Sequence, residues 1–166
     1  MEVGTRRIMH RNVTAHPTAE WTLQQFREAL PGDHTYRFAI HDRDRIRSKD
    51  PDQAVEAMGV RVLRTPVRAP KGNSYCERIV RTARRACLDF MIPFSAGHLR
   101  HTLVEWAAHY NHGRPHRSLG PGIPLPLDPL PSPSACRHQI RGDCRVRAKP
   151  VLGGLHHEYF LEKLAA

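Results

Sequence analysis

Apolar and polar residues alternate along some stretches of the chain in the pattern of β-strands. Residues 36–41 alternate regularly, which predicts a half-buried strand with Asp42 at its C-terminal end. The apolar residues between positions 60 and 63 predict a second strand, because Pro66 then stops the extended run. A weaker alternation over residues 6–14 predicts a third strand. The pattern therefore favours an α/β fold.

Elsewhere the apolar residues recur at helical spacing. Thr18 is a good N-cap for the first predicted helix. In the last predicted helix, Trp106 and Tyr110 fall on one face, and this aromatic face should pack on the body of the protein. Three of the four predicted helices cover residues 19–30, 52–58 and 96–111. The fourth surrounds Glu77, and its apolar side runs from Cys76 to Cys87. Residues 121–133 contain six prolines, which favour an extended linker and exclude a helix.

Composition narrows the class of protein. The chain of 166 residues is 40% apolar, which suits one domain with an appendage. Its formal net charge of +10 favours a polyanionic partner such as nucleic acid, because each Lys or Arg placed against a phosphate releases condensed counterions. No apolar run is long enough to cross a membrane. Without a secretory segment or a CxxC pair, the four cysteines predict a reduced, cytoplasmic setting, and their spacing with the histidines matches no zinc motif.

Two carboxylates stand out as candidates for chemistry. Asp42 emerges at the C-terminal end of a predicted strand, where open α/β sheets place their functional groups. Glu77 lies one turn inside a predicted helix and points away from its apolar stripe. Purely structural roles would also explain both residues. Asp42 could stabilise a turn through its side chain, and Ser74 with Glu77 fits a capping box at the start of the helix. Glu77 could also form an ion pair with Arg81, one helical turn further on.

The surroundings of these carboxylates resemble the DDE integrase/transposase family. In that family an Asp ends a strand, and a Glu at a similar distance further on starts a helix after a Pro-x-x-Asn loop. Here 34 residues separate Asp42 from Glu77, and Pro70 precedes Asn73 at that loop spacing. Residues 110–120, Tyr-Asn-His-Gly-Arg-Pro-His-Arg-Ser-Leu-Gly, are similar to the Tyr-Asn-x-x-Arg-Pro-His-x-x-Leu signature that closes the core of such transposases. The resemblance covers roughly residues 1–120.

The resemblance implies a ribonuclease-H-like mixed sheet flanked by helices. The strand that carries the first catalytic Asp of the family has no counterpart here, and Glu2 corresponds to a hairpin residue rather than a ligand. We therefore expect an N-terminally truncated, incomplete core over residues 1–120. A Pro-rich linker over residues 121–134 and a short basic tail over residues 135–166 should follow.

The resemblance also implies a chemistry, which is polynucleotidyl transfer on DNA by two divalent metal ions, usually Mg²⁺. Asp42 and Glu77 would be the catalytic and metal-binding residues, and a further copy of the chain or a full-length transposase would be a protein partner. The residues expected to bind DNA are Arg68, Lys71, Asn73, Arg78, Arg81, Arg84 and Arg85, although a run of charges is often only a solvated face.

Three functions follow from these features. The first is a truncated integrase core that is inactive by itself, because one carboxylate of the catalytic set is absent. The second is a basic nucleic-acid-binding module without catalysis. The third is an active recombinase that receives the missing strand and Asp from another chain.

Overall fold

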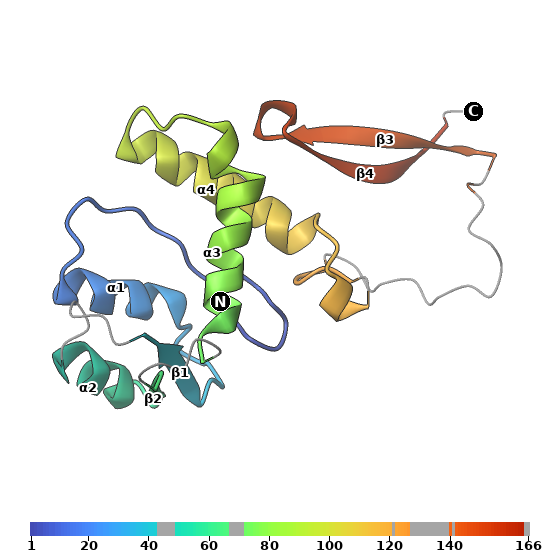
Figure 1. The fold of residues 1–166 in the computed structure, drawn as a ribbon. Coiled ribbons are helices and arrows are strands. Elements are labelled where there is room, and N and C mark those ends of the chain that lie inside the picture. Colours follow the sequence, from blue (N-terminus) through green and yellow to red (C-terminus); the bar gives the residue numbers. More distant parts are fainter. Residues whose placement is uncertain (43–48, 67–71, 121, 127–139, 141, 165–166) are drawn as a thin grey trace. The chain divides into compact units, whose positions relative to one another are not determined.

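The computed structural model describes residues 1–42, 49–66, 72–120, 122–126, 140 and 142–164 (Figure 1). The chain divides into two compact units, one formed by residues 9–97 with Met1 and the other by residues 2–8 and 98–166. Buried apolar side chains occur in both. The most buried are Val55, Val60 and Cys87 in the first unit and Trp106, Ala107, Tyr110 and Val151 in the second.

The first unit contains most of the predicted helices and strands. Its elements are α1 (Ala19–Ala29), β1 (Phe38–His41), α2 (Lys49–Ala57), β2 (Arg61–Arg64), α3 (Ser74–Ala86) and the 3-10 turn η1 (Leu88–Phe90). The predicted cap of α1 is confirmed, because the Thr18 hydroxyl accepts a hydrogen bond from the Trp21 N–H at 3.1 Å. Helix α2 begins earlier than predicted and holds Pro51 in its first turn, where proline costs no helical hydrogen bond.

Strands β1 and β2 form a parallel pair with Ile40 opposite Leu63. The Arg61 N–H donates to the Arg37 carbonyl at 2.9 Å, so the backbone groups of Phe38 and Ile40 point to the other edge of β1. The side chains of Phe38 and Ile40 are 50% and 46% exposed. Within the described residues the sheets are two separate pairs, β1–β2 and the antiparallel β3–β4, and the predicted single mixed sheet is not seen there.

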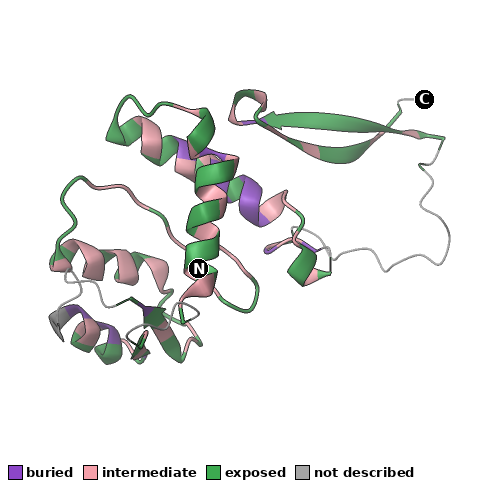
Figure 2. Ribbon diagram, viewed as in Figure 1, coloured by how far each residue is buried: buried purple, intermediate pink, exposed green. Residues whose placement is uncertain are grey.

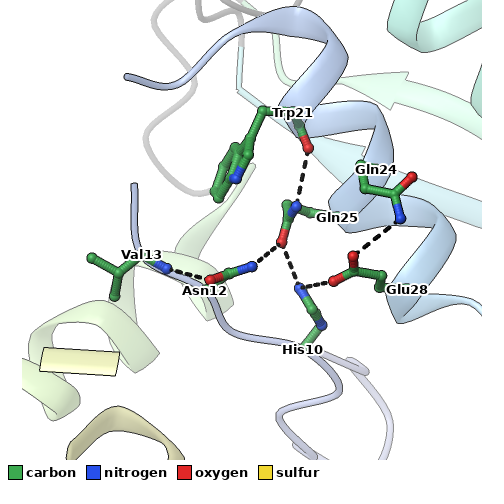
Figure 3. Close-up of polar contacts among 7 residues, drawn as sticks. All are labelled: His10, Asn12, Val13, Trp21, Gln24, Gln25 and Glu28. Carbon is green, nitrogen blue, oxygen red and sulfur yellow. Dashed lines mark hydrogen bonds and ion pairs between the residues drawn. The ribbon is translucent and has the colours of Figure 1, made fainter. Parts of the chain in front are cut away.

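The predicted strand over residues 6–14 is wrong. No strand forms there, and side chains rather than a neighbouring strand hold this segment (Figure 3). His10 Nε2 lies 2.8 Å from Gln25 Oε1 on α1, and the Asn12 amide donates to the same oxygen at 2.8 Å. His10 Nε2 also lies 3.5 Å from the carboxylate of Glu28. A strand needs a hydrogen-bonded partner strand, and weak alternation in the sequence does not provide one. Side chains of α1 hold His10 and Asn12 instead.

The second unit contains α4 and a β-hairpin. Its elements are α4 (Ala96–His112, which begins in the first unit), the 3-10 turn η2 (Arg117–Leu119), β3 (Cys144–Val151), the 3-10 turn η3 (Leu152–Gly154) and β4 (His156–Lys163). Buried positions are concentrated on α4 (Figure 2), and Trp106 and Tyr110 are 3% and 5% exposed, as the aromatic spacing predicted. The hairpin occupies the region expected to be a basic tail.

The hairpin is attached to α4 through polar contacts. The carboxylate of Glu158 on β4 lies 2.9 Å from His109 Nδ1, and the His109 ring stacks on His156 with 4.9 Å between ring centroids. At the hairpin turn, the Leu152 N–H donates to Glu105 Oε1 at 2.6 Å. These contacts give the described hairpin a fixed place on the helix that precedes the signature.

The signature at residues 110–120 folds into a compact corner, as predicted. The Asn111 side chain binds both backbone groups of Ile8, accepting from its N–H at 2.9 Å and donating to its carbonyl at 3.0 Å. The rings of Tyr110 and His116 meet edge to face with 4.5 Å between centroids. The His116 N–H donates to the Gly122 carbonyl at 2.8 Å, which closes the corner.

Burial of this corner changes how its rings titrate. It lowers the pKa of His116, and the nearby Arg114 cation lowers that pKa further, while a hydrogen bond to the Tyr110 backbone opposes the change. The same burial raises the pKa of the Tyr110 hydroxyl, and the cations of Arg114 and Arg6 partly offset the rise. Burial therefore favours the neutral form of both rings.

We predict that Asn111→Ala destabilises the protein by about 2 kcal/mol or more, because both backbone groups of Ile8 lose their partner. Urea denaturation followed by circular dichroism measures the change. Gln24→Ala, which removes an exposed hydrogen bond to Glu28 on α1, is the control and should stay within about 0.5 kcal/mol of wild type. Equal stability of the Asn111→Ala chain and wild type would contradict the assigned role.

We predict that acidification destabilises the corner through His116. Its pKa is lower in the folded than in the unfolded chain, so the unfolded state binds more protons, and the stabilising contribution present above the unfolded pKa is lost as the pH falls through the folded pKa. The loss of stability between about pH 7.5 and about pH 5.5 should be smaller in His116→Gln than in wild type. Thermal melts at both pH values test this, and identical losses would contradict it.

Candidate active site

Asp42 lies where the two parallel strands end. It directly follows β1, and Thr65, directly after β2, donates a weak hydrogen bond from its hydroxyl to Asp42 Oδ1 at 3.4 Å. The Asn73 amide, at the start of α3, donates to the same oxygen at 2.8 Å. The Asp42 side chain is exposed, so three chain segments converge on a carboxylate that solvent can reach. This is the edge at which α/β sheets place functional groups.

Glu77 lies in the first turn of α3, as predicted, and its side chain is exposed. Its backbone N–H donates to the Asn73 carbonyl at 3.1 Å. The capping box is wrong, because the helix begins at Ser74 and Asn73 is therefore the N-cap. No ion pair joins Glu77 to Arg81, both of which lie in the described part of the chain.

Asn73 contacts the side chain of Asp42 and the backbone of Glu77. Its side-chain amide holds Asp42, and its backbone carbonyl holds the N–H of Glu77. An N-cap asparagine usually accepts a hydrogen bond from the first helical turn, which contributes about 1 kcal/mol, yet the Asn73 side chain makes no such bond. Helix α3 therefore lacks a side-chain cap, and the Asn73 side chain contacts Asp42 instead.

A buried histidine contacts the backbone of Asp42. His41 is 3% exposed, and its two ring nitrogens lie 2.7 Å from the Asp42 carbonyl and 2.9 Å from Asp52 Oδ1. Each ring nitrogen of His41 thus lies within hydrogen-bond distance of an oxygen, one on the backbone and one on a side chain. Arg64 Nε donates to Asp52 Oδ2 at 2.6 Å and balances its charge. Sequence reasoning missed this group, and the only available signal was the position of His41 on the covered side of β1.

The predicted DNA-binding arginines of α3 are all exposed. Arg78, Arg81 and Arg85 fall within an arc of about 60° on the helix, at 100° per residue, and Glu77 is on the same side. Arg84 differs, because its Nε lies 3.3 Å from Asp89 and its charge is partly balanced. No residue of α3 is buried (Figure 2). The positive face of α3 is therefore available to an anionic partner.

Two residues of the predicted set, Arg68 and Lys71, lie outside the described residues. Asn73 belonged to the same set, and the structure instead engages its side chain with Asp42. Among the residues expected to contact DNA, the arginines of α3 are therefore the positively charged ones that the structure describes.

The carboxylates at this edge have the donor chemistry that suits a hard divalent cation. No described residue donates a hydrogen bond to Asp42 Oδ2, and Glu77 is exposed beside the same helix start. Mg²⁺ prefers such oxygen ligands and keeps several waters. Among the residues that the structure describes, no group of three or more His, Cys, Asp or Glu is placed to hold a metal ion. The described residues therefore supply oxygen donors but do not by themselves form a complete metal site.

Residues 58–124 match the family model described as Integrase core domain. The matched segment includes Thr65, Asn73, Glu77 and the whole signature corner. This segment belongs to an integrase core domain. No curated protein and no solved structure matches the chain.

The integrase core match covers less than half of the chain, and Asp42 precedes it. Integrase cores have a ribonuclease-H-like fold, act on DNA in integration and transposition, and generally use divalent metals. The match of this segment supports a general role in DNA integration or transposition. None of the helices in the described ranges is both long and apolar enough to pass through a membrane.

Proposed function

We propose that Asp42 and Glu77 are two members of the carboxylate set with which this integrase core acts on DNA phosphates. The observation that carries the proposal is the hydrogen bond from Asn73 to Asp42, which ties the end of β1 to the helix that bears Glu77. Positions 42 and 77 are far apart in sequence, and this contact supports the proposal that they act at one site.

Each residue of the site has a distinct task in this proposal. Asp42 and Glu77 provide oxygen ligands and negative charge, while Asn73 orients Asp42. Arg81 and Arg85 hold the phosphate backbone of DNA along α3. Divalent cations held by Asp42 and Glu77 would supply Lewis-acid activation of a water or a 3′-hydroxyl and would stabilise the leaving oxygen.

We infer that the 166-residue chain does not perform this reaction alone. Two cations held close together would repel one another, and the family's further Asp would help to offset this repulsion. Among the described residues no strand pairs with the second edge of β1, to which the backbone groups of Phe38 and Ile40 point. A second copy or a full-length transposase would add a strand at this edge and supply a further Asp. A purely DNA-binding module would need the arginines of α3 but not the contact between Asn73 and Asp42.

We predict weak DNA binding without sequence preference, with an affinity that falls steeply as salt increases. The double variant Arg81→Glu, Arg85→Glu should bind more weakly, and the slope of log K against log salt should decrease in magnitude by about 2, because two phosphate contacts are lost. Fluorescence anisotropy with several unrelated duplexes provides the measurement.

The control for DNA binding is Arg27→Glu, which reverses one charge at an exposed position of α1 and is compared with the single variant Arg81→Glu. Its salt dependence should stay close to that of wild type. Equal weakening by the α1 and α3 variants would mean that net charge alone governs binding, and the assignment of the α3 face would be wrong.

We predict that the chain alone neither cuts nor joins DNA. An oligonucleotide cleavage and strand-transfer assay with Mg²⁺ or Mn²⁺ should give no product that depends on Glu77, because positioning errors near 1 Å and missing ligands each lower the rate steeply. Product that requires the cation and disappears in Glu77→Gln would refute the prediction. Product that persists in Glu77→Gln would come from a contaminating nuclease and leave the expected result in place.

A further inference from the structure

The hairpin of β3 and β4 has two different faces. Successive side chains of a strand point to opposite faces, and His156 and Glu158, which both contact His109, therefore define the face turned toward α4. The positions between them form a second face, which we call the open face. Its residues are Val146, Ala148, Pro150, His157, Tyr159 and Leu161.

The open face is largely apolar and exposed, as is most of the hairpin (Figure 2). Tyr159 is 71% exposed, because it lies opposite Ala148, whose side chain is too small to cover the ring. Val146 and Leu161 form the next cross-strand pair on this face and are 49% and 59% exposed. The open face therefore presents an aromatic ring beside an apolar pair, which is a surface on which a planar group can stack.

The charges of the hairpin favour an anionic partner. β3 and β4 contain four Lys or Arg and two Glu, which gives a net charge of +2. Arg145 and Arg147 share the carboxylate of Glu162, at 2.6 Å and 3.1 Å, so this group keeps an excess positive charge. Lys163, at the end of the open face, forms no ion pair with a described residue. A second copy of this chain, which carries a net charge of +10, would be repelled, whereas a polyanion would be attracted.

We propose that the open face binds single-stranded DNA, with an unpaired base stacked on Tyr159 and the phosphates held by Lys163 and the arginines of β3. Aromatic rings next to cations bind single strands without sequence preference, because every base has a π-face. A base in a duplex is already stacked on its neighbours and must be unstacked at a cost, so this site should prefer single strands. The inference goes beyond the proposed function, since it involves neither the two carboxylates nor the arginines of α3.

The test is fluorescence anisotropy of the full chain with a labelled thymidine oligonucleotide and with a duplex of equal length. Tyr159→Ala should weaken binding of the single strand about fivefold or more, which is the lower end of the effect of one stacked base. Binding of the duplex should change little. Tyr159→Phe retains the ring and should bind as wild type does, whereas Tyr159→Leu retains apolar bulk alone and should bind as weakly as Tyr159→Ala.

The matched control is Phe160→Ala. Phe160 is the next residue along β4, is 51% exposed and points to the face turned toward α4. Its removal should leave binding of the single strand close to wild type. A second measurement is ultraviolet crosslinking of an oligonucleotide that contains 5-iodouracil, and mass spectrometry of the attached peptide should identify Tyr159.

The outcomes separate this inference from the proposed function. Unchanged single-strand binding in Tyr159→Ala, or an equal loss in Phe160→Ala, overturns the role of the open face. In either case the proposed function stands if the double variant Arg81→Glu, Arg85→Glu still weakens binding of the duplex. A dimer in light scattering that Tyr159→Ala dissociates would make the open face an interface between two copies and would also overturn the inference.

Discussion

Backbone and carboxylate groups in this chain need hydrogen-bond partners. Side-chain amides provide some of these hydrogen bonds, in places where a larger sheet would provide them through a neighbouring strand. Asn111 binds both backbone groups of Ile8 in the way that a neighbouring strand would. Asn73 performs the corresponding task for the carboxylate of Asp42. Short chain segments without strand partners are therefore fixed by single residues, which concentrates the structural requirements on a few positions.

The helices could be predicted from the sequence because their signals are local. Thr18 caps α1, and the spacing of Trp106 and Tyr110 identifies the buried side of α4. The strands were less predictable, since a strand is stabilised by a partner that may be distant in sequence. Weak alternation over residues 6–14 led to a wrong strand, while residues 144–163 form a hairpin that was interpreted as a basic tail.

The second error has an identifiable cause. Arg145 and Arg147 alternate with Val146 and Ala148, and this is the period of a strand. The density of basic residues favoured the interpretation as a charged tail. In the structure, Arg145 and Arg147 form ion pairs with Glu162 on the opposite strand. The candidate site shows the same limit: motif spacing located Asp42 and Glu77, but the tie through Asn73 and the support from His41 depend on contacts between separate segments.

The attachment of the hairpin to α4 bears on where this protein can be shortened. The integrase match ends at residue 124, which makes it an obvious boundary for producing a smaller fragment. A fragment that ends there would lose Glu158 and Leu152, and with them the partners of His109 and Glu105. Each lost partner of a buried polar group costs about 1–3 kcal/mol, and His109 is only 8% exposed. The smallest fragment that preserves the signature corner should therefore extend through β4, beyond the segment that defines the family.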